Sequence, residues 1–339
     1  MKVMSFVHLH THSHYSLLDG MSKIKDMVKL AKEHGMSAIA LTDHGVMYGA
    51  IDFYTNCVKN GIKPIIGVEA YVANRSRHQK EPGIDNKRYH LTLLAKNNTG
   101  YQNLIKLTTA AHLEGYYYKP RVDKDLLRAH AEGLICLSGC PGSELGRAIQ
   151  HGNKEKAEKI ILEYRDIFGP ENYYLEVMHH PDVEFFQEWK GALIEFSRKL
   201  NIPLVATQDS HYLHPDDAFA HKTLVAISTH TDVEDTAIFS GNGEYHFISS
   251  EEAAKFPPQQ LIIVCTGAQA EDRAVLARIA NREHRHFRVI PGDTIIFSSS
   301  IIPGNERAVQ TLKDALAKQG ARIIHSDLMD IHASGHGFS

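Results

Sequence analysis

Short apolar runs alternate with amphipathic stretches along the first three quarters of the chain. The predicted strands are the apolar runs at residues 6–12, 37–42, 63–72, 89–95, 133–137, 173–177 and 203–206. The predicted helices are the stretches with helical periodicity at residues 22–33, 48–60, 100–112, 142–150, 153–168, 183–200 and 216–228. Ser22 is the expected N-cap of the first helix, and Gly35 is its expected end. Repeated strand–helix units of this kind predict an α/β fold with a parallel sheet, and their number favours a closed barrel.

The pattern starts afresh near Phe256-Pro257-Pro258. Beyond it we expect strands at residues 261–267, 293–300 and 321–325, and helices at 270–281 and 304–319. We therefore expect two modules, residues 1–256 and 257–339, the second a small α/β segment. Within the first module, residues 74–87 are polar and contain Gly and Pro, and they predict a surface loop.

Composition is that of an ordinary soluble globular protein, with 339 residues, 43% hydrophobic and 23% charged. No apolar run is long enough to cross a membrane. The first residues reach a histidine-rich segment too early for a signal peptide, and the four cysteines lack a paired framework, so we expect a cytoplasmic protein. A net charge of −3 excludes a protein that holds nucleic acid by charge alone. A nucleic-acid substrate would need local contacts, metal ions or further domains.

The densest signal for metal ligands is the segment His8-Leu-His10-Thr-His12-Ser-His14, followed by Asp19. In an extended strand, residues two apart point the same way, so His10 and His12 can aim two imidazoles at one point. Imidazole pairs suit zinc, manganese or iron. A purification tag or solvated histidine tract is the alternative, but the interleaved Leu, Val, Phe and Tyr favour a buried strand. His8 and His14 lie on the same face, and packing alone explains them equally well.

Ligand-type residues also recur near the ends of the other predicted strands, where βα folds build their sites. They are Asp43 and His44, Glu69, His90, Cys140, and Asp209 with His211. A single buried histidine is more often a core residue than a ligand, and Cys140 alone is more often an inert apolar filler. Together they predict a multinuclear metal site.

The chemistry expected of such a site is phosphoester cleavage, because neighbouring metals activate water and stabilise both the attacking and leaving oxygens. Glu69 is the candidate bridging carboxylate, and a Cys140 thiolate would favour zinc over magnesium. Asp43 either orients an imidazole or caps a strand end. Lys119 and Arg121 either hold a substrate phosphate or form a solvated loop pair.

The motifs of this module also carry a family likeness. His10-Thr-His12, Asp19-Gly20, Thr42-Asp-His44-Gly45, Gly67-Val-Glu69, His90, Ser138-Gly-Cys140 and Asp209-Ser-His211 resemble those of PHP (polymerase and histidinol phosphatase) domains. Segments such as Gly61-Ile-Lys-Pro-Ile-Ile-Gly67 and Lys119-Pro-Arg121 are similar to the PHP domain of bacterial DNA polymerase III alpha subunits. The resemblance covers about residues 3–256.

The PHP resemblance implies a distorted (βα)7 barrel that binds up to three ions, Zn²⁺ or Mn²⁺. It implies a phosphoester-cleaving site, with 3′–5′ exonuclease proofreading in some members. The implied ligands are His10, His12, Asp19, His44, Glu69, His90, Cys140, Asp209 and His211, of which Glu69, Asp19 and His12 are the candidate catalytic residues. All nine positions match, so we expect a metal-competent site.

A second resemblance covers about residues 259–339. Val264-Cys-Thr-Gly267, the run from Pro291 to Ser300, and His332-Ala-Ser-Gly-His336 are similar to the β-CASP region of ribonuclease J. The His-x-His-x-Asp-His metal motif of that family is absent, so we expect this segment alone to be catalytically empty.

Three hypotheses follow. The first is a metal-dependent phosphoesterase acting on the 3′ end of single-stranded DNA, or on a small phosphoester. The second is a non-catalytic, metal-stabilised module that binds other replicative polymerase subunits. The third is a ribonuclease J-like RNA-processing nuclease that depends on His336. We expect no polymerase activity, because the likeness stops where the aspartates of nucleotidyl transfer would follow, and no membrane partner.

Overall fold

The computed structural model describes residues 6–178, 180, 184–233, 245–253, 275–283, 288–289, 294–297 and 304–325. Contacts between residues divide the chain into one compact unit, Ser5–Ser249, and a second, which comprises Met1–Met4 and Ser250–Ser339. The strand predicted at residues 261–267 lies outside the described residues, as does His336. The division into two modules at residue 256, with different functions, stays a prediction.

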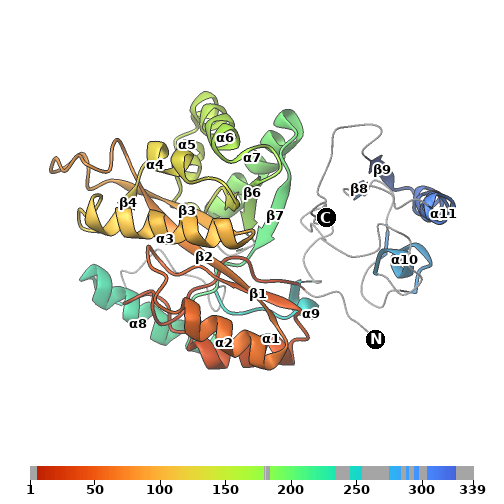
Figure 1. Ribbon diagram of the computed structural model, residues 1–339, viewed down its shortest axis with the longest axis horizontal. Coiled ribbons are helices and arrows are strands. Elements are labelled where there is room, and N and C mark those ends of the chain that lie inside the picture. Colours follow the sequence, from red (N-terminus) through yellow and green to blue (C-terminus); the bar gives the residue numbers. More distant parts are fainter. Residues whose placement is uncertain are drawn as a thin grey trace. The chain divides into compact units, whose positions relative to one another are not determined.

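The first unit is built on one curved seven-stranded sheet (Figure 1). Its strands are β1 (Ala38–Leu41), β2 (Lys63–Ala73), β3 (Arg88–Ala95), β4 (Arg121–Val122), β5 (Leu134–Leu137), β6 (Tyr173–Met178) and β7 (Leu204–Thr207). They run in the order β1-β2-β3-β5-β6-β7, and the short β4 pairs with β2. The strand predictions agree with these elements to within a few residues, except that no prediction covers β4 and the helix after it.

One strand departs from the predicted parallel sheet. β3 runs antiparallel to both β2 and β5, whereas the remaining pairs are parallel. The reason is the connection: the loop of residues 74–87 joins β2 to β3 without a crossover helix, so the chain turns straight back. The prediction of a parallel sheet is therefore wrong at this position.

The histidine-rich segment links the two ends of the sheet. On one side, the amides of Ala40 and Thr42 donate to the carbonyls of His8 and Thr11 at 2.8 and 2.9 Å. On the other, the His12 amide donates to Ser210 O at 2.8 Å. The segment is extended but makes only isolated bridges, so the strand predicted at residues 6–12 is present as a connecting segment rather than a regular strand.

Helices surround the curved sheet (Figure 1). They are α1 (Ile24–Glu33), α2 (Ala50–Asn60), α3 (Asn98–Leu113), α4 (Lys124–Ala129), α5 (Glu144–Gln150), α6 (Lys154–Phe168), α7 (Glu184–Leu200) and α8 (Ala218–Thr229), the last preceded by a 3-10 turn at Pro215–Asp217. Ser22 does not cap α1, because it pairs with Ser13 in an isolated bridge while α1 begins after Lys23. Asn97, Asp123 and Ser143 cap α3, α4 and α5 through their side-chain oxygens.

The main core lies between the sheet and helices α3 to α7. Leu93, Leu104, Leu134 and Trp189 are fully buried in it. A second cluster, which includes Phe53, fixes α1 and α2 beside β1. Each such aliphatic or aromatic side chain stabilises the fold by about 1.5–3 kcal/mol through burial. This packing holds the strand ends, and with them the candidate site, in a fixed arrangement.

The second unit contains α9 (Ser250–Ala253), α10 (Val275–Ala280), β8 (Thr294–Phe297), α11 (Glu306–Ala317) and β9 (Arg322–His325). β8 and β9 are parallel and are joined through α11. Leu276, Val309, Leu312 and Leu316 form a small hydrophobic cluster of their own. The strand–helix–strand pattern predicted for residues 293–325 is confirmed. In the described part of the chain, no helix is long and apolar enough to cross a membrane.

Candidate metal centre

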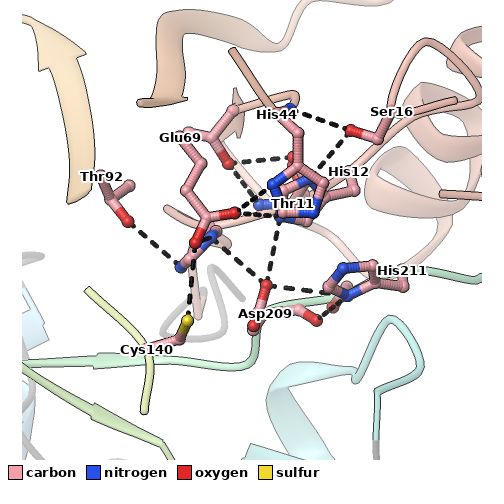
Figure 2. Close-up of polar contacts among 12 residues, drawn as sticks. Thr11, His12, Ser16, His44, Glu69, Thr92, Cys140, Asp209 and His211 are labelled. Atoms are coloured by element: carbon pink, nitrogen blue, oxygen red, sulfur yellow. Dashed lines mark hydrogen bonds and ion pairs between the residues drawn. The ribbon is translucent and has the colours of Figure 1, made fainter. Parts of the chain in front are cut away.

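Glu69 occupies the middle of the candidate site, on β2, and is 1% exposed. Its two carboxylate oxygens face different groups (Figure 2). Oε1 lies 3.5 Å from His10 Nε2 and 3.0 Å from His90 Nδ1. Oε2 lies 3.4 Å from His12 Nε2 and 2.6 Å from His44 Nδ1. One carboxylate thus stands between two sets of imidazoles, which is the placement that a bridging ligand needs.

His10 and His12 project from the connecting segment toward the same point. Their ring centroids are 5.2 Å apart. Asp209, which follows β7, places Oδ1 at 3.3 Å from His10 Nε2 and at 3.2 Å from His12 Nε2. Its backbone φ of 53° is left-handed, a conformation that costs energy for a residue with a Cβ and is retained where surrounding structure fixes it. The expected pairing of His10 with His12 is present.

Asp19 marks the open side of the site, with its side chain 25% exposed. Oδ2 lies 2.8 Å from His44 Nε2 and 3.6 Å from His211 Nε2. The His211 ring stacks against that of His12 at 4.3 Å. His221 on α8 lies 3.4 Å from Asp19 Oδ1. The carboxylate is therefore surrounded by three imidazoles.

Cys140 completes the set near Glu69. Its Sγ lies 3.6 Å from Glu69 Oε1 and 3.6 Å from His90 Nδ1. The side chain of His90 is 28% exposed, so it lies with Asp19 on the accessible side, whereas His10, His12 and Glu69 are buried. All nine residues predicted as ligands converge on one site.

The donor set fits divalent metal ions. Five buried ligand-type atoms contact other members of the cluster but make no hydrogen bond of good geometry among the described residues: His10 Nε2, His12 Nε2, His44 Nδ1, Glu69 Oε2 and Asp209 Oδ1. Buried polar atoms are normally satisfied, so their convergence indicates a ligand. Three overlapping groups bring ligand atoms within 4.8 Å of one another: His12, His44 and His211; His10, His12 and Glu69; and His44, Glu69 and His90. Imidazole, carboxylate and thiol donors match zinc, or manganese at the oxygen-rich positions.

The electrostatics of the site favour cation binding. Burial, with the charges of His44 and His211, lowers the pKa of His12 to about 3, so its imidazole is neutral at pH 7. Burial raises the pKa of Glu69, but His90, His44 and His10 outweigh it and hold this pKa well below its usual range. Burial is likewise outweighed by the carboxylates around His10, and the pKa of that imidazole is raised well above its ordinary value. At His10, protons and metal ions therefore compete for the imidazole, whereas the His12 imidazole is free of a competing proton at neutral pH.

A second layer of side chains fixes the ligands. Glu176 on β6 is fully buried, and its Oε1 lies 2.7 Å from His10 Nδ1. His12 Nδ1 lies 2.9 Å from the hydroxyl of Ser16, which donates to Asp43 Oδ1 at 2.7 Å. A carboxylate behind a ligating imidazole sets its tautomer and orientation. Asp43 therefore orients the imidazole of His12 through the Ser16 hydroxyl, and not the imidazole of its neighbour His44.

Other candidates from the sequence lie elsewhere. His8 is buried, places Nε2 at 3.0 Å from the Ile248 carbonyl and stacks on Phe247 at 3.9 Å, so it packs outside the ligand cluster. His14 is exposed. Lys119 lies near the open side: burial and the charge of Arg88 lower its pKa, against the opposing effect of Asp19.

The substrate-binding prediction for Arg121 is wrong. Its side chain is fully buried, and its guanidinium donates to four backbone carbonyls, those of Gly115, Asp85, Arg77 and Gln79, at 2.7–3.0 Å. With its donors engaged in this way, Arg121 fastens the loop of residues 74–87 and cannot reach a phosphate.

The sequence patterns missed Glu176 and His221. A carboxylate in the middle of an otherwise apolar run at residues 173–178 was the available signal for Glu176, because a buried charge requires a partner. His221 carried no such signal, since a single histidine on a helix is usually a packing residue.

Comparison with known proteins places this arrangement in a family. Residues 8–180, more than half of the chain, match the PHP domain family, and the chain therefore belongs to it. Residues 226–316 match the family described as Ribonuclease J, beta-CASP domain. That second match begins earlier than the expected residue 259 and does not reach His336.

Similar curated proteins include alpha subunits of DNA polymerase III. The DNA polymerase III subunit alpha of Treponema pallidum is 46% identical over 257 residues, 75% of this chain and 22% of that protein. The same subunit of Thermus aquaticus is 45% identical over 236 residues, 68% of this chain and 19% of that protein. The chain thus spans about a fifth of the length of these relatives. A solved amidohydrolase from Chromobacterium violaceum is 16% identical with a TM-score of 0.40, over 60% of this chain and 87% of that one.

Proposed function

We propose that the PHP domain of this chain is a metal-dependent phosphoesterase that removes nucleotides from the 3′ end of single-stranded DNA. The observation that carries the proposal is the convergence of eight ligand-type side chains around a ninth, Glu69, in a site that is buried at His10 and His12 and open at Asp19 and His90. Its nucleic-acid substrate is inferred from the relatives, which are DNA polymerase III alpha subunits.

The proposed ligands are His10, His12, Asp19, His44, Glu69, His90, Cys140, Asp209 and His211. The overlapping groups of donors support up to three ions of Zn²⁺, Mn²⁺ or both. When bound, such ions generate a nucleophile at neutral pH and stabilise charge on the phosphoryl oxygens. The remaining contributions come from the chain itself.

The chain's own residues divide into holding and positioning roles. Glu69 presents one oxygen to each set of imidazoles, so it fixes the spacing between the two halves of the site. The imidazole of His12 is neutral, so its Nε2 lone pair is available to a metal ion. Burial raises the pKa of Asp19, but His211 and the other imidazoles around it hold this pKa well below its usual range, so the group is an acceptor at the open side.

The burial of the Cys140 thiol, together with Glu69, raises its pKa well above the usual range. A bound cation is therefore required to make Cys140 a thiolate ligand. This dependence makes zinc the expected occupant beside Cys140, with manganese at positions that lack sulfur.

The test is hydrolysis of 5′-labelled primers with a mismatched 3′ end, by the purified chain with Mn²⁺ or Zn²⁺. We expect loss of product with Asp19→Asn and His12→Ala, and unchanged activity with His14→Ala, which alters an exposed histidine outside the cluster. Metal content by mass spectrometry on each protein separates loss of ions from loss of turnover. Full metal occupancy with no turnover in the unmodified chain would contradict the proposal.

That last outcome would support the non-catalytic alternative, a metal-stabilised module that binds other replicative polymerase subunits. The match to the beta-CASP family is the observation in favour of a ribonuclease J-like activity. It predicts RNA cleavage that survives loss of His10 and His12 but not of His336. We propose a cytoplasmic location under each of these functions. Primer extension by the chain is expected to be absent.

A further inference from the structure

The ligand-bearing face of β2 and β3 continues beyond the metal centre. In this antiparallel pair, Glu69 is opposite Thr92, Tyr71 is opposite His90, and Ala73 is opposite Arg88. Alternate residues of a strand share a face. The row that carries Glu69 and His90 therefore passes to Tyr71 and then to Arg88, outward from the buried end of the site.

Two cations converge on the ring of Tyr71. Arg88 Cζ lies 5.6 Å from the ring centroid, and Lys119 Nζ lies 5.7 Å from it. The same ring lies 5.9 Å from that of His44 and 5.3 Å from that of His90. Tyr71 is itself 6% exposed, so it is a spacer between the cations and the ligands, rather than an open surface.

The pairing of β4 with β2 fixes the position of Lys119. Arg121 is aligned with Tyr71 in this pair, and Lys119 precedes the paired position by two residues. The buried guanidinium of Arg121 ties β4 to the carbonyls of Arg77 and Asp85. The segment that carries Lys119 is thus anchored next to the metal centre.

No carboxylate pairs with Arg88 or Lys119 among the residues that the structure describes. The guanidinium of Arg88 donates to the Asn86 carbonyl at 3.1 Å. By contrast, Arg75 and Arg77 nearby are each paired with acidic side chains. Two like charges held over one ring repel each other, and an anion placed between them would relieve that repulsion.

We propose that Arg88 and Lys119 form a second phosphate-binding subsite, which holds a backbone phosphate next to the scissile one. The inference rests on the proposed function and narrows its substrate class. Because Tyr71 separates the two cations from Glu69 and the imidazoles, the phosphate they bind is not the one at the metal centre. The site therefore selects a strand with consecutive phosphodiesters over an isolated phosphomonoester.

The experiment compares Arg88→Gln, Lys119→Gln and the double variant of the full chain. Lys25→Gln, which removes an exposed charge on α1, is the matched control, and Lys119→Arg should retain binding. Equilibrium binding of a labelled oligonucleotide with hydrolysis-resistant phosphorothioate linkages is measured by fluorescence anisotropy over a range of salt. Hydrolysis of an ordinary oligonucleotide and of p-nitrophenyl phosphate is measured in parallel, with thermal unfolding as the check on folding.

We expect each glutamine variant to weaken oligonucleotide binding roughly three- to tenfold. The salt slope of binding should fall by about 0.7 for each phosphate that the variant no longer neutralises. The KM for the oligonucleotide should rise with little change in kcat, and p-nitrophenyl phosphate hydrolysis should change by less than about twofold.

Unchanged affinity and salt slope in the double variant would overturn the subsite. So would an equal loss on the oligonucleotide and on p-nitrophenyl phosphate, because the cations would then serve the scissile phosphate. If the unmodified chain binds the oligonucleotide through this pair but hydrolyses nothing, the subsite stands and the proposed phosphoesterase function fails. The two proposals therefore fail separately.

Discussion

Replacing Arg121 tests its assigned structural role, which is to hold the loop of residues 74–87 in place through hydrogen bonds to backbone carbonyls. Arg121→Met keeps most of the buried stem and removes the guanidinium with its four bonds. Of the four carbonyls, those of Arg77 and Gln79 belong to residues that are at least partly exposed and can turn to water. Those of Asp85 and Gly115 belong to buried residues and would lose their partner.

The expected loss follows from these two buried acceptors. An unsatisfied buried carbonyl costs about 1–3 kcal/mol, so Arg121→Met should lower the free energy of unfolding by about 4 kcal/mol, within a range of roughly 2 to 6. Arg121→Lys keeps the charge but not the planar fork, and it should recover less than half of that loss. Arg128→Met, at a guanidinium-bearing residue whose side chain is 48% exposed, should cost less than about 0.5 kcal/mol.

Denaturant unfolding followed by tryptophan fluorescence is the appropriate assay. Trp189 is the single tryptophan of the chain and is fully buried in the core of the first unit, so its emission reports the unfolding of that unit. A midpoint for Arg121→Met that matches the Arg128→Met control would refute the reasoning. Loss of oligonucleotide binding at unchanged stability would refute it too, and would restore Arg121 as a phosphate ligand.

The metal centre gives three further predictions. Cys140→Ser should reduce bound zinc per chain, measured by mass spectrometry, whereas Cys57→Ser in the α1–α2 core should leave metal content unchanged. Glu176→Gln should weaken metal affinity about 10- to 100-fold, because it removes the carboxylate behind His10; equal affinity in a competition titration with a chromogenic chelator would contradict this role. Removal of metal by a chelator should lower the thermal stability reported by Trp189, by about 2.7 kcal/mol when the free metal had been at 100 times its Kd. An unfolding curve that does not respond to the chelator would show that the ions do not support the fold.

The ligands could be predicted because each lies in a short segment with a local signal. His10 and His12 are two residues apart in an apolar segment, and Glu69 and Asp209 lie within or just after apolar runs. The period of two and the rule that strand ends gather at one edge then suffice to bring them together. Neither rule identifies the side chains that form hydrogen bonds to the ligands and orient them.

The residues that escaped prediction depend on long-range register. Glu176 meets His10 across 166 positions of sequence, and His221 meets Asp19 across 202. Arg121 looked like a phosphate ligand because a basic residue near a polar loop is usually solvated. Arg121 is buried because β3 runs antiparallel to β2 and the connecting loop of residues 74–87 has no helix to pack on it. The guanidinium of Arg121 packs under this loop instead.

The charge of the site links metal binding to folding. Folding brings the carboxylates of Asp19, Glu69 and Asp209 into one site, and Glu176 is fully buried directly behind it. Imidazoles compensate part of this charge: the nearby carboxylates outweigh burial and raise the pKa values of His10, His44 and His211, whereas His12, with its pKa of about 3, contributes no charge at neutral pH. Bringing such groups out of water costs several kcal/mol per ion unless a counter-charge lies among them. The hydrophobic core can offset that cost, but divalent cations bound among the carboxylates remove it. The charges that would make the site a catalyst therefore also make the metal ions bind the folded state in preference to the unfolded chain, so metal binding stabilises the fold.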